Sequence, residues 1–218
     1  MTISLKSHYL KIIIGPMFSG KSSSLLKYIN NIEDNVNVNV IVINSILDKQ
    51  RHLDMEIDKN GIGFMKTHDS KKFPAIMLKN LTELNTNKTY NKKYLESSIV
   101  LIDEGQFYDD MYLFLKEELS KIGSKKFIVA GLSSDINQNA IGDIVKLIPL
   151  ADDIEKLSAF CVYCKDGTFG NFTKLLVNND TDTDTDTDTD TKTGTIKVGS
   201  NNMYAPTCRY HLFNPIKT

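Results

Sequence analysis

Two short segments of this chain have residue types and spacings suited to binding and transferring phosphate. The first runs from Gly15 to Ser22 and reads Gly-Pro-Met-Phe-Ser-Gly-Lys-Ser, which is the spacing of a phosphate-binding loop. Its glycines permit backbone angles that point N–H groups at a polyphosphate, and the helix expected after it presents the positive end of its dipole. We therefore predict that Lys21 reaches the β- and γ-phosphates of a nucleotide and that Ser22 binds Mg²⁺. A chance glycine-rich turn is the alternative.

The second segment is a pair of carboxylates, Asp103 and Glu104, directly after the apolar run 97–102. An Asp at the end of a strand beside a phosphate-loop strand commonly anchors Mg²⁺. The neighbouring Glu104 would then take a proton from a hydroxyl as that hydroxyl attacks the γ-phosphate. The pattern alone leaves two other interpretations of Glu104 open: it orients a water for hydrolysis of a nucleoside triphosphate, or it only caps the next helix.

The cysteines indicate a metal site near the end of the chain. Cys161 and Cys164 form a Cys-x-x-Cys pair, Cys208 and His211 form a Cys-x-x-His pair, and together they account for every cysteine. Four such ligands close a tetrahedral Zn²⁺ site with no open position, so we predict a structural zinc, which contributes roughly 10 kcal/mol of folding free energy in small domains. Unrelated buried cysteines with a surface histidine are the alternative.

The elements that must position these residues alternate between strand and helix patterns. Apolar, β-branched runs predict strands, and apolar residues at helical spacing predict helices. The alternation predicts an α/β fold with a doubly wound, mostly parallel sheet, whose ligands bind at the carboxyl ends of the strands. Residues 44–75 favour loops with a short strand. The predicted strands are 9–14, 38–43, 74–78, 97–102 and 126–131, and the predicted helices are 22–29, 81–95 with a polar interruption, and 111–121.

The last third of the chain differs in character from the rest. We predict an α/β nucleotide-binding domain over residues 1–152 and a zinc-binding domain over residues 153–218. Within the latter, six aspartates alternate with threonine from Asp180 to Thr191. Such a tract cannot bury apolar surface, so we expect a disordered insert at 179–193. Calcium binding by the tract is an alternative, but the turn-forming glycines of calcium repeats are missing.

Composition excludes several classes of protein. The formal net charge is −1 over 218 residues, and no dense Lys/Arg run with interleaved aromatics is present, so we predict no nucleic-acid partner. The apolar segment 12–14 is far shorter than the roughly 20 residues that span a bilayer, so we expect no membrane association. Three cysteines are an odd number for a disulfide scaffold. A protein of the reducing cytoplasm is the expectation.

These segments resemble the type II, cellular-type thymidine kinases. The resemblance rests on the loop 15–22, on Ile-Asp-Glu-Gly-Gln-Phe at 102–107 and on the two zinc pairs, and it covers roughly Ile12 to His211. It implies an α/β nucleotide-binding domain with a zinc-held lasso that closes over the nucleoside. The implied activity is transfer of the γ-phosphate of ATP to the 5′-hydroxyl of thymidine, with Mg²⁺. It also implies a homotetramer and feedback inhibition by thymidine triphosphate.

The resemblance also assigns individual residues. Glu104 corresponds to the general base, Lys21 and Arg51 to the other catalytic positions, and Ser22 and Asp103 to the magnesium positions. The implied ATP-binding residues are Gly15, Pro16, Met17, Phe18, Ser19, Gly20, Lys21, Ser22, Asp48, Arg51, Asp103, Glu104, Gly105 and Gln106. The implied thymidine-binding residues are Met17, Phe107, Leu132, Ile136, Ile141, Thr173, Ile196, Lys197, Val198, Gly199 and Tyr204.

Three departures from the family pattern concern the nucleotide and the nucleoside. The family reads Asp-x-Arg where this chain has Asp48-Lys-Gln-Arg51, with one extra residue. Ile136 and Ile141 stand where two pocket phenylalanines are expected, and losing ring stacking costs about 0.5–1.5 kcal/mol per pair. The Asp-Thr tract lengthens the lasso. None removes a group needed for phosphoryl transfer, so we expect an active kinase with weakened or broadened nucleoside selection.

Two competing interpretations stay open. A phosphate-loop NTPase whose zinc module binds nucleic acid or protein would show a basic face around residues 161–211, whereas the Asp-Thr tract makes this region acidic. A kinase with a broader deoxynucleoside range, including deoxyuridine, would follow from the isoleucines at 136 and 141. Measuring phosphorylation of several deoxynucleosides distinguishes the two.

Overall fold

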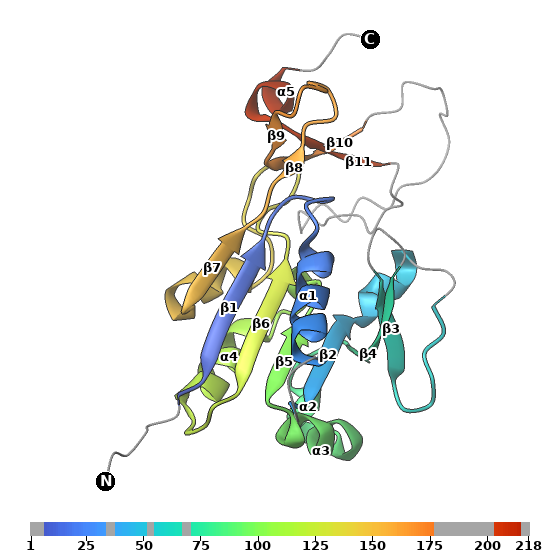
Figure 1. The fold of residues 1–218 in the computed structure, drawn as a ribbon, viewed down its shortest axis with the longest axis vertical. Coiled ribbons are helices and arrows are strands. Elements are labelled where there is room, and N and C mark those ends of the chain that lie inside the picture. The colour runs from blue at the N-terminus through green and yellow to red at the C-terminus, as the bar shows by residue number, and fades with distance from the viewer. Residues whose placement is uncertain (1–6, 34–37, 52–54, 67–70, 177–202, 215–218) are drawn as a thin grey trace.

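The computed structural model describes residues 7–33, 38–51, 55–66, 71–176 and 203–214, and a seven-stranded sheet runs through it (Figure 1). The strand order is β3-β4-β2-β5-β6-β1-β7, and β3 pairs antiparallel with β4 while the other neighbours are parallel. The predicted mostly parallel α/β sheet is confirmed. The strands are β1 (Tyr9–Ile14), β2 (Val40–Ser45), β3 (Ile62–Lys66), β4 (Lys72–Leu78), β5 (Ile99–Ile102), β6 (Lys126–Gly131) and β7 (Asp153–Lys156).

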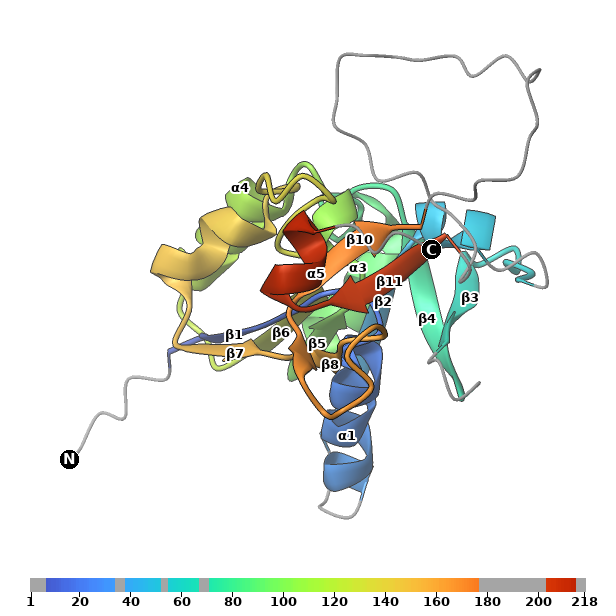
Figure 2. The same ribbon diagram turned by 90° about the horizontal axis from the view of Figure 1, so that it is seen from above.

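Helices cover both faces of the sheet because its central strands are apolar on both sides. Ile12 and Ile13 are fully buried neighbours on β1 that pack into opposite layers, as the alternation of side chains along a strand requires. Figure 2 shows α1 on one side of the sheet and α4 on the other. Beside β1 lies α1 (Lys21–Glu33), and the opposite layer holds α2 (Glu83–Thr86), α3 (Lys88–Glu96), α4 (Met111–Ser120) and the 3-10 helix η3 (Ile144–Leu150).

The region predicted as an interrupted helix, 81–95, is divided at Asn87. The side-chain oxygen of Asn87 accepts hydrogen bonds from the backbone N–H of Thr89, at 2.9 Å, and of Tyr90. These bonds satisfy donors that the first turn of α3 leaves without partners, so the polar interruption is also the cap of the second helix. In the segment 44–75, the structure contains the 3-10 helix η1 (Ile46–Arg51) and the edge strand β3.

Smaller elements at the C-terminal end lie over the carboxyl ends of the sheet strands (Figure 1). Two antiparallel pairs and a short helix make up this region: β8 (Ala159–Phe160) with β9 (Phe169–Gly170), β10 (Phe172–Leu175) with β11 (Tyr204–Thr207), and α5 (Arg209–Phe213). The large sheet includes β7, which follows residue 152. The division into units 1–152 and 153–218 stays a prediction, and the Asp-Thr insert at 179–193 lies outside the described residues.

Within the described residues, the structure contains no helix that combines the length and the apolar character needed to cross a membrane.

A buried carboxylate joins α3 and α4 on one face of the sheet. Glu118 is 5% exposed and accepts hydrogen bonds from the Tyr94 hydroxyl at 2.6 Å, the Lys121 ammonium at 2.6 Å and the Asn85 amide at 3.3 Å. Burial alone would raise the pKa of Glu118, but the hydrogen bonds from Lys121, Tyr94 and Asn85 lower it below its usual range. Ionised Glu118 therefore stabilises the packing of the two helices.

We expect Glu118→Gln to lower the free energy of unfolding by about 1–3 kcal/mol at pH 7, because the donors Tyr94, Lys121 and Asn85 lose a charged acceptor. The lowered pKa means that the contribution of Glu118 is present above its unfolded pKa and is lost as the pH falls through the folded value. The difference from the wild type should therefore shrink below about pH 4.

Chemical denaturation at pH 7 and at lower pH measures this difference. The matched control is Glu117→Gln, because Glu117 is 70% exposed and pairs with the same Lys121 at 3.2 Å. Equal losses for the two variants, or a loss for Glu118→Gln that does not depend on pH, would contradict the assignment.

Candidate active site

The loop between β1 and α1 has the backbone that its glycines predict. Gly20 has a φ of +82°, and a Cβ at Gly15 would lie 2.8 Å from the carbonyl oxygen of Leu157. Phe18 also has a positive φ, 64°, which is uncommon for a residue with a side chain and is typical of functional loops. The helix α1 begins directly after this turn, at Lys21.

Polar side chains within this loop bind its own backbone. The Ser19 hydroxyl donates to the carbonyl oxygen of Pro16 at 2.9 Å, and the Lys21 ammonium donates to the same oxygen at 2.7 Å. The cation of Lys21 therefore lies at the mouth of the loop. A helix N-terminus with an adjacent ammonium is an arrangement suited to binding phosphate.

The predicted carboxylates gather beside the loop at the end of β5. Asp103 is 3% exposed, its N–H donates to the carbonyl oxygen of Ile43 at 2.9 Å, and its carboxylate is hydrogen-bonded to Ser22. Burial, followed by the charges of Glu104 and Asp48, raises the pKa of Asp103 to about 7, and the hydrogen bond with Ser22 opposes this rise. Clustered carboxylate and hydroxyl oxygens form the donor set that hard divalent cations prefer, and such a cation would offset their mutual repulsion.

Asp48 comes from η1, which directly follows the end of β2. It is 4% exposed and accepts a hydrogen bond from the Asn44 amide at 2.9 Å. Asp48 is thus close enough to Asp103 to influence its titration, in keeping with its predicted place near the nucleotide. The backbone of Arg51 ends η1, but its side chain lies outside the described part of the chain, so its predicted catalytic role stays a prediction.

The loop and Glu104 meet in one pocket. About 430 Å³ of empty space, part of it open to solvent, lies between the phosphate-binding loop and the ends of β5 and β6. Ser23 is part of its lining although only the residues up to Ser22 were predicted, because the motif ends there. The lining residues are Met17, Phe18, Gly20, Lys21, Ser22, Ser23, Glu104 and Leu132.

An apolar cluster continues from this pocket toward the C-terminal elements. Met17, Leu132 and Tyr204 are its buried members. Ile136 and Ile141 pack against them, so five predicted thymidine-binding residues come together. Phe18, Leu175 and Met203 also pack against the cluster. No motif marks Leu175 or Met203, and only the pairing of β10 with β11 brings them here.

Thr173 joins the phosphate-binding loop to β10. Its hydroxyl oxygen accepts a hydrogen bond from the backbone N–H of Met17 at 3.0 Å, and both residues are buried. The resemblance placed Thr173 at the thymidine pocket, and the structure places it against the loop that lines that pocket. A residue more than 150 positions along the chain therefore holds the backbone of the nucleotide loop.

The other predicted residues differ in how far the structure describes them. Phe107 is half-buried in the 3-10 helix η2 (Gly105–Phe107), and Gly105 and Gln106 are buried there. The predicted lasso contacts of Ile196, Lys197, Val198 and Gly199 lie outside the described residues.

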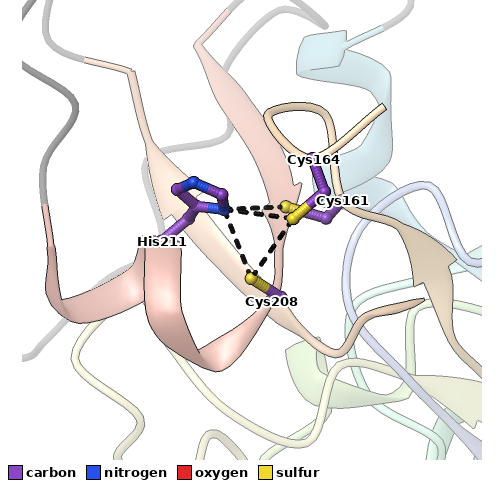
Figure 3. A group of neighbouring side chains, drawn as sticks. All are labelled: Cys161, Cys164, Cys208 and His211. Atoms are coloured by element: carbon purple, nitrogen blue, oxygen red, sulfur yellow. Dashed lines mark hydrogen bonds between the residues drawn. The ribbon is translucent and has the colours of Figure 1, made fainter. Parts of the chain in front are cut away.

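The predicted zinc ligands form a compact cluster (Figure 3). The Nδ1 atom of His211 lies 3.5 Å from the Cys161 sulfur and 3.3 Å from those of Cys164 and Cys208, and the Cys164 and Cys208 sulfurs are 3.8 Å apart. Zn–S bonds of about 2.3 Å in a tetrahedron require sulfurs about 3.8 Å apart. The cluster therefore has the composition and the spacing to hold Zn²⁺.

The pKa values of the cysteine thiols also indicate a site suited to a cation. Burial tends to raise the pKa of Cys161, but backbone hydrogen bonds and His211 lower it to about 6. Burial and the neighbouring thiols raise the pKa of Cys164 to about 11. Several thiolates cannot lie this close without a compensating positive charge, which a divalent metal would supply.

The parallel sheet, the glycine-containing loop after β1 and the carboxylates after β5 define a phosphate-loop nucleotide-binding protein of the α/β class. Sequence comparison narrows this class. The model of the family described as thymidine kinase matches residues 8–212, and the chain belongs to that family.

Curated relatives come from plants and viruses. A thymidine kinase of Choristoneura fumiferana entomopoxvirus is 33% identical over 92% of this chain and 94% of its own length. Thymidine kinase a of Arabidopsis thaliana is 32% identical over 92% of this chain and 73% of its own. A thymidine kinase of Oryza sativa subsp. japonica is 32% identical over 93% of this chain, which spans 65% of the rice protein.

We expect Thr173→Val to lower the free energy of unfolding by about 1–3 kcal/mol, because the buried N–H of Met17 loses its acceptor. The loop should then also bind ATP several-fold more weakly. Thr173→Ser keeps the hydroxyl and is the matched control, with a smaller loss. Denaturation and nucleotide titration measure both effects. A loss in Thr173→Val no larger than that in Thr173→Ser would contradict the role of the hydroxyl.

Proposed function

We propose that this chain is an ATP-dependent thymidine kinase that transfers the γ-phosphate of ATP to the 5′-hydroxyl of thymidine. Membership of the thymidine kinase family supports phosphorylation of thymidine. The observation that carries the proposal is the single pocket lined by Lys21, Ser22 and Glu104. It combines a phosphate-binding cation, a hydroxyl bound to a buried carboxylate, and a second carboxylate suited to take a proton.

In the proposed reaction each residue of the site has a separate role. The loop 15–22 and Lys21 hold the phosphates, and Ser22 with Asp103 would hold Mg²⁺, which supplies charge neutralisation when bound. Glu104 takes the proton of the 5′-hydroxyl while the oxygen of that hydroxyl forms a bond to the γ-phosphorus. The bond between that phosphorus and the bridging oxygen breaks, and ADP leaves with thymidine monophosphate as the second product.

The apolar cluster around Met17, Leu132 and Tyr204 is the proposed site for the thymine base. Its aliphatic members Ile136 and Ile141 stand where the family resemblance leads us to expect phenylalanines, so the ring stacking of those phenylalanines is lost. The proposed backbone contacts of residues 196–199 would complete the pocket. A deoxynucleoside range broader than thymidine is the second candidate, and the presence of these isoleucines in the cluster favours it.

We further propose that the Cys161, Cys164, Cys208 and His211 cluster binds one structural Zn²⁺. The four ligands leave no open position, so the metal takes no part in the chemistry. Its role is to hold the segment between β8 and β9, which carries Cys161 and Cys164, against Cys208 and His211 at the end of β11 and in α5. The strand β11 pairs with β10, from which Thr173 reaches the phosphate-binding loop. The thiols fit a cytoplasmic setting, and a homotetramer and inhibition by thymidine triphosphate are proposals that rest on the family alone.

For the reaction, we expect Glu104→Gln to reduce kcat for thymidine by about 10²–10⁴-fold, because the amide cannot accept the proton. Steady-state phosphorylation of thymidine, deoxyuridine, deoxycytidine and deoxyguanosine with ATP·Mg²⁺ tests both the acceptor and the base. Thymidine-selective turnover that collapses in the variant supports the proposal, and turnover of all four nucleosides supports the broader range. Hydrolysis of ATP without dependence on a nucleoside would instead support an NTPase.

For the metal, we expect the purified protein to contain one zinc ion per chain and His211→Ala to lose it. Loss should lower the melting temperature, because metal binding by such clusters contributes directly to folding. The matched control is His8→Ala, since the His8 ring accepts from the N–H of Lys125 at 3.0 Å, outside the cluster. Elemental analysis and thermal melts test this. A wild-type protein that contains no zinc and melts at the same temperature as His211→Ala would refute the zinc assignment.

A further inference from the structure

Gln106 is a buried side chain that touches the proposed general base. It is 4% exposed, its Nε2 donates to the Oε2 atom of Glu104 at 2.5 Å, and its Oε1 accepts from the N–H of Leu132 at 2.9 Å. We propose that Gln106 is a positioning residue that fixes the carboxylate of Glu104 for proton transfer. This inference rests on the proposed kinase function, and it differs from the nucleotide contact that the family resemblance implies for Gln106.

The orientation of the Gln106 amide follows from its partner on the backbone. The N–H of Leu132 can only donate, so the amide oxygen must face it. The NH₂ group of the same amide is then directed at Glu104, where it can only donate. A carboxylate accepts such a bond in its ionised form, which is the form that a base requires.

Two glycines leave the space that Gln106 occupies. A Cβ at Gly131 would lie 2.7 Å from the side-chain Oε1 atom of Gln106, and a Cβ at Gly142 would lie 2.3 Å from its backbone carbonyl oxygen. A side chain at either position would displace Gln106. The closely fitted slot indicates that Gln106 has one position, so the hydrogen bond it makes to Glu104 has one direction.

The backbone of Glu104 explains why its carboxylate needs such a support. Glu104 has a φ of 53° and precedes the short 3-10 turn of η2, so no regular helix or strand orients its side chain. Its carboxylate faces a pocket that is partly open to solvent. Through Gln106 the Oε2 atom is tied to Leu132, which belongs to the apolar cluster proposed to bind the base. The Gln106 amide therefore links the proposed general base, Glu104, to a residue that lines the proposed nucleoside site.

Gln106→Met tests the proposal, because it keeps the length of the side chain and removes both hydrogen bonds. We expect kcat for thymidine to fall by about 10–100-fold, while KM for ATP and for thymidine changes by less than about 3-fold. A raised KM for ATP with an unchanged kcat would show that Gln106 contacts the nucleotide and would overturn the proposal.

A double-mutant cycle separates positioning from a general structural effect. If Gln106 acts through Glu104, Gln106→Met should cause no further loss of kcat, within about 2-fold, in protein that already carries Glu104→Gln. The same fold-loss in both backgrounds would mean that Gln106 acts independently of Glu104, and the proposal would be wrong.

Two further variants guard against misfolding. Gln106→Glu keeps an oxygen for the N–H of Leu132 but presents a second carboxylate to Glu104, so kcat should again fall at least 10-fold while the protein stays folded. Wild-type activity in this variant would overturn the proposal. Asn85→Leu is the matched control, because it removes an amide that donates to the Glu118 carboxylate at 3.3 Å, remote from the pocket, and should leave kcat unchanged.

The outcomes also distinguish the inference from the proposed function. If the wild-type protein phosphorylates no thymidine, both fail together. If the wild type is active and Glu104→Gln is not, but Gln106→Met is as active as the wild type, only the positioning role fails.

Discussion

The parallel pairing of β1 and β5 with β6 is the constraint on which the rest of the site depends. Ile14, the last residue of β1, is in register with Gly131, and Ile102, the last of β5, is in register with Val129. Because both outer strands run in the same direction as β6, the phosphate-binding loop and the carboxylates leave the sheet at one edge. Hydrophobic burial of these strands thus fixes the distance between the phosphate-binding loop and the carboxylates, which are far apart in the sequence.

That edge is also where unfavourable charge is concentrated. Asp48, Asp103 and Glu104 come together in a largely buried place, and burial makes ionised carboxylates costly. The sheet tolerates this arrangement because Ser22 and Asn44 donate hydrogen bonds to it and because the site suits a divalent cation. The same reasoning applies to the thiols of the C-terminal cluster, whose composition and spacing also suit a cation.

The C-terminal elements are connected to the sheet through the site itself. Thr173 on β10 accepts from the N–H of Met17, and Tyr204 on β11 packs with Met17 and Leu132. A change in the cluster of Cys161, Cys164, Cys208 and His211 beside these strands would therefore reach the phosphate-binding loop through direct contacts. Gln106 makes a comparable connection on the other side of the pocket, between Glu104 and the end of β6.

Local patterns in the sequence predict the chemical groups of the site and the order of the elements. The loop 15–22, the pair Asp103 and Glu104 and the cysteine spacing are local patterns, and the alternation of apolar runs with helical spacing predicts a parallel sheet. Which distant residues meet these groups depends on the three-dimensional packing of the chain. Leu175 and Met203 joined the apolar cluster through strand pairing, and the Gln106 amide turned toward Glu104 because the N–H of Leu132 occupies its other side. Such contacts depend on register and close packing between segments far apart in the chain, which no local pattern records.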